Sequence, residues 1–226
     1  MSSRPYVLLS VAMSLDGYID DASAERLLLS NAEDLARVDE VRAGVDAILV
    51  GANTVRSDNP RLVLREPRLR EQRRARGDHP DPIKVTITGS GDLDPQANFF
   101  QLGESPKIVY ALSSTVSTVA ARLGTLADVV DAGDPLDVPK MLEDLASRGV
   151  RRLMVEGGGA IHTLFLAAGF VDELHVVVAP LFVADERAPR FVNPGAFPVT
   201  ARMTLAEVRQ IGDCALLRYL SGEADA

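Results

Sequence analysis

Three consecutive glycines form the strongest candidate binding motif in the sequence. Gly157, Gly158 and Gly159 follow an apolar run that ends at Val155, and they precede a helical pattern over Ala160–Ala168. Glycine lets the backbone adopt positive φ and approach a ligand closely. Backbone N–H groups at the start of a helix favour an anion such as a phosphate or a pyrophosphate. The alternative is a tight strand-to-helix turn without a ligand, because the run is not the dinucleotide fingerprint G-x-G-x-x-G.

Acidic and small polar side chains follow several of the predicted strands. Glu156 lies at the carboxyl end of the apolar run Arg152–Val155, where ligands bind in open α/β sheets. It could accept hydrogen bonds from the amino groups of a substrate or satisfy a neighbouring loop. Ser14 and Asp16 end the first predicted strand, and Asp58 follows the second. These two segments fit ligand loops at the same sheet edge, and they also fit plain turns.

Arginine is concentrated in one segment. Seven arginines lie among the sixteen residues from Arg61 to Arg76, whereas the whole chain has only three lysines, Lys84, Lys107 and Lys140. The arginine side chain presents a fixed fork of donors that fits phosphates and carboxylates. Arg61 and Arg65 are the better phosphate ligands because they lie nearest the preceding motif. The alternative is a solvated, partly helical excursion between two strands.

Several kinds of chemistry lack the residues they need. The only cysteine, Cys214, excludes a disulfide framework, a four-cysteine zinc site and an iron–sulfur cluster. His79, His162 and His175 show no metal-ligand spacing, and neither G-x-S-x-G nor H-E-x-x-H occurs. We therefore expect no metal, and we expect the reactivity to come from a bound cofactor.

The charge and the hydropathy pattern limit the possible partners. The chain has 32 acidic and 24 basic residues and a net charge of −8, which is not typical of a nucleic-acid binder. No apolar run reaches the roughly 18 residues of a membrane span, and no secretory segment is visible at the start, so no membrane partner is expected. A lone cysteine fits a reducing compartment, so the predicted location is cytoplasmic.

Apolar runs alternate with helical patterns, which is typical of a three-layer α/β fold with a mostly parallel central sheet. The predicted strands are Tyr6–Met13, Val45–Val50, Ile83–Thr88, Lys107–Ala111, Asp128–Val130, Arg152–Val155 and Glu173–Ala179.

Two helices are predicted over Val138–Arg148 and Ala160–Ala168. Another follows the capping-box spacing Ser30-Asn31-Ala32-Glu33, in which the serine would bond N–H groups of the first turn. Near the end, Gly212-Asp213 separates Met203–Ile211 from Cys214–Leu220, which predicts a C-terminal antiparallel hairpin. We expect a single domain over residues 1–226, with its core over about residues 4–220.

Several short motifs follow one another along the chain. They are Ser14-Leu15-Asp16-Gly17, then Gly51 with Thr54, Asp58-Asn59-Pro60-Arg61-Leu62 and Arg65, then Val155-Glu156-Gly157-Gly158, then Val171-Asp172-Glu173-Leu174 and Ala179-Pro180. In their order and spacing, these motifs together resemble the pyrimidine reductase of riboflavin biosynthesis, the reductase half of a bifunctional deaminase–reductase. The similarity covers about Arg4 to Leu220. It implies a dihydrofolate-reductase-like fold, a homodimer, and an NADPH-dependent reduction of the ribosylamino chain of a phosphorylated pyrimidine to a ribitylamino chain.

The resemblance also implies roles for individual residues, among them Arg65 as the clamp on the substrate phosphate. Asp16 and Glu156 are the candidate catalytic acids because they are the nearest acids by motif, and water is the alternative proton donor. The residues implied to bind the cofactor are Ala12, Thr54, Asp58, Gly89, Ser90, Gly158, Gly159, Ala160, Ile161, His162 and Thr163. The candidate substrate-binding residues are Ser14, Arg26, Arg42, Arg61, Leu62, Arg65 and Glu156.

The chain departs from the family in two respects. The loop before the first helix often carries a serine and a tryptophan in that family, whereas Arg26 and Leu28 stand at those places here. For this reason a reductase of the same fold that acts on a pterin such as dihydrofolate stays open. The zinc deaminase half is absent, because its H-x-E and P-C-x-x-C elements do not occur. A third alternative is a module that binds NADPH without catalysis.

Overall fold

The computed structural model describes residues 4–23, 25–195, 197 and 202–222. The chain divides into two compact units. The first unit comprises Met1–Pro5 and Asp39–Met154, and the second comprises Tyr6–Val38 and Val155–Ala226. The expectation of a single domain stays a prediction.

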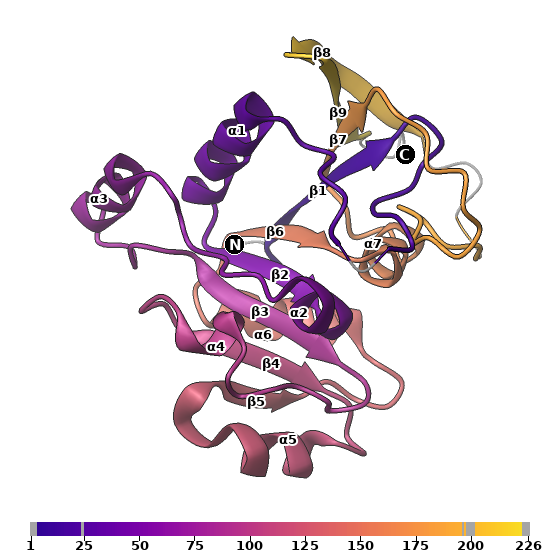
Figure 1. Ribbon diagram of the computed structural model, residues 1–226. Coiled ribbons are helices and arrows are strands. Elements are labelled where there is room, and N and C mark those ends of the chain that lie inside the picture. The colour runs from indigo at the N-terminus through magenta and orange to yellow at the C-terminus, as the bar shows by residue number, and fades with distance from the viewer. Residues whose placement is uncertain (1–3, 24, 196, 198–201, 223–226) are drawn as a thin grey trace. The chain divides into compact units, whose positions relative to one another are not determined.

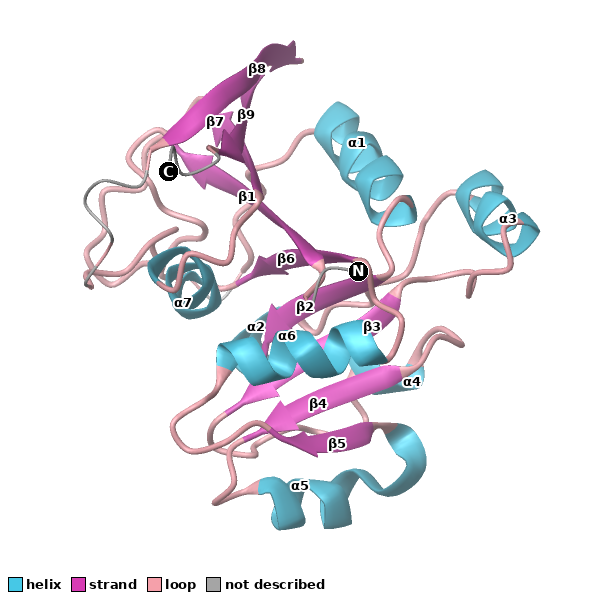
Figure 2. Cartoon of the chain, turned by 180° about the vertical axis from the view of Figure 1, so that it is seen from behind, coloured by secondary structure: helices cyan, strands magenta, loops and turns pink. Residues whose placement is uncertain are grey.

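The first unit is built on four parallel strands in the order β5-β4-β3-β2. Figures 1 and 2 show helix α2 on one face of these strands and helix α6 on the other, which gives three layers. The strands are β2 (Ala47–Gly51), β3 (Ile83–Thr88), β4 (Lys107–Ala111) and β5 (Asp128–Asp131). The helices are α2 (Ala52–Asp58), α3 (Pro67–Ala75), α4 (Asn98–Gln101), α5 (Val116–Leu123), the 3-10 turn η1 (Gly124–Leu126) and α6 (Val138–Ser147).

Burial explains the regular elements of this unit. Every residue of β2 is buried, as expected for a strand covered on both faces. Helix α6 buries one stripe of apolar side chains, at positions 138, 141, 142 and 145, and Asp137 caps it by accepting the N–H of Lys140 at 3.0 Å. Two further elements span the division of the units, namely α1 (Ala32–Ala43) and β6 (Arg152–Gly157).

The second unit combines parallel and antiparallel strands in the order β1-β7-β9-β8. Strands β1 (Tyr6–Ser14) and β7 (Glu173–Ala179) run parallel, whereas β9 (Cys214–Ser221) pairs antiparallel with both β7 and β8 (Met203–Ile211). Helix α7 (Gly159–Ala167) belongs to the same unit. The α/β class with a mostly parallel sheet and a C-terminal antiparallel hairpin is therefore confirmed.

Strand β8 departs from regular pairing at one place. Its register with β9 shifts between Leu205 and Glu207, which marks a β-bulge or a similar irregularity. Leu205 and Val208 expose 51% and 63% of their surface, so these apolar side chains do not belong to the core. Cys214, in contrast, is buried with Leu216 and Ile211 in an apolar cluster, as expected for a small hydrophobic residue.

Two sequence-based expectations are wrong at the local level. Helix α1 begins at Ala32, and Asn31 caps it by accepting the N–H of Asp34 at 2.9 Å, so the predicted serine is not the cap. The predicted turn or ligand loop after the second strand is instead helix α2, which reaches Asp58. It was missed because α2 follows β2 directly and buries only two side chains, so no apolar periodicity marks it.

Candidate functional site

The segment of residues 59–66, here called the arginine loop, is hydrogen-bonded by a buried lysine. Lys84 on β3 has no exposed surface. Its Nζ donates hydrogen bonds to the carbonyl oxygens of Arg61 at 2.6 Å, Phe99 at 3.2 Å and Leu102 at 2.6 Å. One ammonium group therefore ties the arginine loop to the backbone in and directly after α4.

Two buried carboxylates hold the second half of the arginine loop. Asp81 accepts the N–H of Leu64 at 2.9 Å through Oδ1, and it receives the guanidinium of Arg70 at 2.8 Å through Oδ2. Asp39 accepts the N–H groups of Arg65 and of the next residue at 2.9 and 3.0 Å. Both carboxylates are nearly inaccessible, with 0% and 2% exposure. Charged side chains thus set the backbone, and they leave the arginine side chains of the loop uninvolved.

Two residues of the arginine loop, Leu62 and Asn59, have an unusual backbone conformation. Both residues adopt a left-handed backbone, with φ of 46° and 43°. Such a conformation is uncommon for a residue with a side chain and costs about 1 kcal/mol or more. Asn59 is tied to Asn98, whose N–H donates to its Oδ1 at 2.7 Å. Leu62 as a whole is only 4% exposed, so little of this residue is accessible to a substrate.

The seven arginines from Arg61 to Arg76 separate into two groups. Arg61 and Arg65 are exposed, and neither side chain has a partner among the residues that the structure describes. Arg74 is likewise exposed, on α3. The other four bind the protein itself: Arg68 pairs with Glu40, Arg70 with Asp81, and Arg73 and Arg76 donate to backbone carbonyls that include Ala43. Four of the seven arginines therefore stabilise the protein itself, whereas Arg61 and Arg65 are available to an anion.

The remaining candidates of the first unit gather where its strands end. Gly89 and Ser90 follow β3 directly and are exposed. Thr54 and Asp58 lie half-buried on α2, which begins where β2 ends. Because β2 and β3 run parallel, Gly89 and Ser90 lie at the same carboxyl edge of the sheet at which α2, the helix with Thr54 and Asp58, begins. Arg42, half-buried, lies in the last turn of α1.

The glycine turn, defined as residues 157–160, needs glycine for two separate reasons. Gly158 has φ of +77°, which side chains rarely tolerate. At Gly159 a Cβ atom would lie 2.2 Å from the carbonyl oxygen of Arg190, a distance that real Cβ atoms do not show. The backbone of Arg190 therefore packs directly on the turn, and this contact alone accounts for one of the three glycines.

The start of α7 fits an anionic group such as a pyrophosphate. The first N–H groups of an α-helix have no partner within the helix, and no acidic residue occupies the first turn of α7. Ile161 and His162 expose only 9% and 1% of their surface, and both of their backbone N–H groups donate to the carbonyl of Gly158 at 3.0 Å, so the earlier N–H groups of the turn are the ones that fit an anion. Ala160, in contrast, is exposed.

The side chains behind the glycine turn are engaged within the protein. Burial lowers the pKa of His162 to about 4, so its ring is neutral at physiological pH. The ring packs edge-to-face on Phe191, with 5.3 Å between the centroids. Thr163 donates its hydroxyl to the carbonyl of Gly159 at 2.6 Å and accepts the N–H of Asn193 at 2.9 Å. These contacts fix the turn without placing a charge beside it.

The motif after β1 is a turn whose side chains bind its own surroundings. Ser14 is fully buried, and its hydroxyl donates to Asp16 and accepts the N–H of Tyr18 at 3.0 Å. Asp16 also accepts the N–H groups of Val183 at 3.2 Å and Ala184 at 2.8 Å. The Ser14 hydroxyl, followed by these N–H groups, lowers the pKa of Asp16. A carboxylate held ionised in this way has no proton to donate at neutral pH.

The other candidates of the second unit lie on three elements. Glu156 is half-buried near the carboxyl end of β6, and Ala12 is half-buried in β1. Arg26 is exposed in the segment between β1 and α1, close to Leu28, which exposes 72% of its surface.

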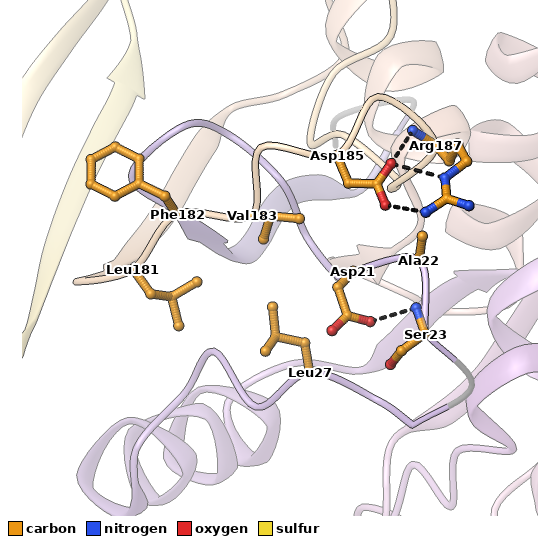
Figure 3. A pocket seen from close by; sticks show the side chains of 9 residues that line it. All are labelled: Asp21, Ala22, Ser23, Leu27, Leu181, Phe182, Val183, Asp185 and Arg187. Carbon is orange, nitrogen blue, oxygen red and sulfur yellow. Dashed lines mark hydrogen bonds and ion pairs between the residues drawn. The ribbon is translucent and has the colours of Figure 1, made fainter.

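A pocket of about 410 Å³ lies between the segment of residues 21–27 and the segment that follows β7, as Figure 3 shows. Asp185 and Arg187 form an ion pair at its rim, and Phe182 is 72% exposed there. Asp16 holds one wall through Val183. None of the lining residues was predicted from the sequence, since short loops without a motif carry no signal. They are Asp21, Ala22, Ser23, Leu27, Leu181, Phe182, Val183, Asp185 and Arg187.

The described parts of the chain hold neither a cluster of metal-ligating side chains nor a membrane-spanning helix. No three His, Cys, Asp or Glu side chains there are grouped as metal ligands. None of the helices formed by those residues has both the length and the apolar character to cross a membrane.

The same arrangement of elements occurs in a solved structure of RibD from Acinetobacter baumannii. The TM-score is 0.77 at 22% identity, over 98% of this chain and 59% of that chain. The chain thus spans about three fifths of that protein, and the fold defines the class as RibD-like α/β proteins. The sequence matches the RibD C-terminal domain over residues 5–217. The chain belongs to this family, which confirms the resemblance inferred from the motifs.

Two curated relatives are similar over nearly their whole length. The protein from Archaeoglobus fulgidus is 34% identical over 212 residues, which cover 93% of this chain and 95% of the relative. The protein from Methanothermobacter thermautotrophicus is 34% identical over 220 residues, covering 96% and 98%. Both are named 2,5-diamino-6-ribosylamino-4(3H)-pyrimidinone 5′-phosphate reductase.

Proposed function

We propose that this chain is an NADPH-dependent reductase of riboflavin biosynthesis. Its substrate would be a phosphorylated ribosylamino-pyrimidine, and its product the ribitylamino form. The observation that carries this proposal is the likeness, over nearly the full length of both chains, to two relatives named as reductases of the 2,5-diamino-6-ribosylamino-pyrimidinone 5′-phosphate. Those names favour the diamino compound over its deaminated form as the substrate.

The substrate phosphate is assigned to Arg65, with Arg61 as the second ligand. Both side chains are exposed on a loop whose backbone is fixed by buried charges. A guanidinium bound to a phosphate makes strong, charge-assisted hydrogen bonds, often in pairs. Glu156 is assigned to the amino groups of the pyrimidine, because its carboxylate can accept hydrogen bonds from their N–H groups.

The nicotinamide cofactor supplies a hydride to the substrate when it is bound. The start of α7 and the glycine turn are assigned to its pyrophosphate, because a helix N-terminus presents free N–H groups and the first turn of α7 holds no acidic residue. Thr54, Asp58, Gly89 and Ser90 are assigned to the rest of the cofactor, along the edge where β2 and β3 end. The preference for NADPH over NADH comes from the family resemblance.

The proton of the reaction is assigned to Glu156 or to water. Asp16 is the less suitable acid, since its pKa is lowered by the Ser14 hydroxyl and by two backbone N–H groups. It acts as a positioning residue, because it ties the turn after β1 to the segment that follows β7.

The test is the oxidation of NADPH with a panel of three substrates: the diaminopyrimidinone phosphate, its deaminated form and dihydrofolate. We expect the fastest turnover with the diamino compound and a product that has gained two hydrogens. Turnover of dihydrofolate alone would establish the pterin alternative. NADPH binding without turnover of any of the three would establish a non-catalytic module.

We further propose that the protein is a homodimer. Five of its large apolar side chains in the second unit expose half or more of their surface, and association of two copies would remove such groups from water. They are Leu15, Leu28, Phe182, Leu205 and Val208. Light scattering during size-exclusion chromatography measures the mass directly, and a monomer at all concentrations would contradict this proposal. The cytoplasmic location stays a prediction.

A further inference from the structure

We infer that Lys84 is a positioning residue for phosphate recognition. Its buried ammonium group fixes the backbone of the arginine loop so that Arg61 and Arg65 present their guanidinium groups to the substrate phosphate. This inference rests on the proposed function, because it takes the arginine loop as the place where the phosphate binds.

The number of hydrogen bonds explains why a lysine occupies this position. Three carbonyl oxygens, of Arg61, Phe99 and Leu102, surround Nζ within 3.2 Å. A charged ammonium group offers three donors and no acceptor, so it satisfies all three. A neutral amine offers only two donors, and an apolar side chain of the same length offers none.

The surroundings of Lys84 leave little room for a substitute. Gly103 has φ of +75°, and a Cβ atom there would lie 3.0 Å from Cγ1 of Val63 and 3.7 Å from Cε of Lys84. The ring of Phe99 lies on another side, with its centroid 5.9 Å from Nζ. The lysine stem is therefore confined and cannot move to other partners. If its hydrogen bonds are lost, the backbone of the arginine loop loses its support.

Burial and a neighbouring positive charge lower the pKa of the Lys84 ammonium group. Asp81, itself bound to Arg70, and Lys107, which donates to the Gly103 carbonyl at 3.0 Å, are the nearest charges. Burial, and next the charge of Lys107, lower the pKa of Lys84 to about 8, against the opposing effect of Asp81. As the pH rises through about 8, the ammonium group loses a proton and one of its three carbonyls loses its donor.

The experiment compares Lys84→Met with Lys140→Met, which removes an exposed lysine from α6. The readouts are the KM values for the phosphorylated substrate, for the same substrate without its phosphate, and for NADPH. We expect Lys84→Met to raise the KM for the phosphorylated substrate by about tenfold. The other two KM values should change by less than about twofold, and Lys140→Met should change none of the three.

The pH profile provides a second readout that a merely structural role would not move. In the unmodified protein, the KM for the phosphorylated substrate should rise above a pH of about 8 while the KM for NADPH stays level. In Lys84→Met, which has no titrating group at this position, the KM should be high already at neutral pH and should not rise further above a pH of about 8. If Lys84→Met does not fold, the profile of the unmodified protein decides the question.

Arg65→Ala separates a failure of this inference from a failure of the proposed function. If Arg65→Ala leaves the KM for the phosphorylated substrate unchanged, the arginine loop does not bind the phosphate and the proposed role of the loop is wrong. If Arg65→Ala raises that KM but neither Lys84→Met nor alkaline pH does, the inference about Lys84 is overturned. Equal increases of all KM values in Lys84→Met would overturn it as well.

Discussion

The arginine loop and the glycine turn are both suited to anions, yet they are built by opposite means. The arginine loop is held by three buried ionised side chains, from Lys84, Asp81 and Asp39, which bond its backbone. The glycine turn is held without an ionisable side chain, through the positive φ of Gly158, the contact of Gly159 with the Arg190 carbonyl and the hydroxyl of Thr163.

The difference follows from what each region presents to the ligand. The arginine loop offers long side chains, so its backbone must be fixed to limit the entropy lost when they bind. The glycine turn offers its own N–H groups, so any side chain would stand between the backbone and the anion. The first region is therefore expected to be sensitive to charge and pH, and the second to added volume.

Gly159→Ala should give the largest effect, because its Cβ atom would lie 2.2 Å from a backbone oxygen that cannot rotate away. We expect a loss of about 3 kcal/mol in the free energy of unfolding and a loss of NADPH affinity of about 100-fold. Thermal unfolding and fluorescence titration measure the two. Gly169→Ala, which has φ of +72° at the other end of α7 but open space around it, is the control and should cost only about 1 kcal/mol. Equal losses in both variants would contradict the steric explanation.

Asp39→Ala should destabilise the protein by about 2 to 3 kcal/mol, since two backbone N–H groups of the arginine loop lose their acceptor. The KM for the phosphorylated substrate should rise while the NADPH affinity stays unchanged. The matched control is Glu40→Ala, the adjacent residue, whose carboxylate is half exposed in an ion pair with Arg68. It should change the free energy of unfolding by less than about 0.5 kcal/mol. A weakened NADPH affinity in Asp39→Ala would contradict the assignment of the arginine loop to the substrate and of the glycine turn to NADPH.

Arg65→Ala should raise the KM for the phosphorylated substrate by about 10- to 30-fold without a change in stability, because its exposed side chain supports no other part of the protein. Arg74→Ala removes an equally exposed arginine from α3 and should leave the KM unchanged. Steady-state kinetics and thermal unfolding of both variants measure this. An equal effect of the two would mean that general positive charge, rather than a clamp at Arg65, attracts the substrate.

The smallest effect concerns the pH dependence of NADPH binding. The buried ring of His162 has a pKa of about 4 and the first turn of α7 has no acidic residue, so the glycine turn carries no group that titrates near neutrality. The dissociation constant for NADPH should therefore change by less than about twofold between a pH of about 7 and about 9. Calorimetric titration measures it, and an increase parallel to that of the substrate KM would show that both regions depend on the same titrating group.

The sequence predicts the strands well and the supports of the site poorly. Strands such as Ile83–Thr88 and Glu173–Ala179 have the predicted bounds because β-branched and apolar residues dominate both segments. Helix α3 has no such pattern, since one of its two buried residues is Arg73, whose charge is satisfied by carbonyl oxygens. A charged residue reads as exposed unless its partners are known.

The candidate ligands themselves were predictable, but what holds them was not. Arg61 and Arg65 could be selected from seven arginines by their distance from a motif, and the structure leaves both side chains available. Lys84 is the second residue of the strand Ile83–Thr88, and a lysine in such a place normally faces water. Its three carbonyl partners come from the arginine loop and from the backbone in and directly after α4, and no local pattern in the sequence brings those segments together.

The bulge in β8 bears on how the protein resists polymerisation. β8 is the last of the described strands in its sheet, and a regular edge of nine residues would offer a template for a strand of another molecule. The shifted register between Leu205 and Glu207 twists that edge and interrupts its row of hydrogen-bonding groups. The β8 edge is therefore a poorer template for a strand of another molecule than a regular edge of the same length.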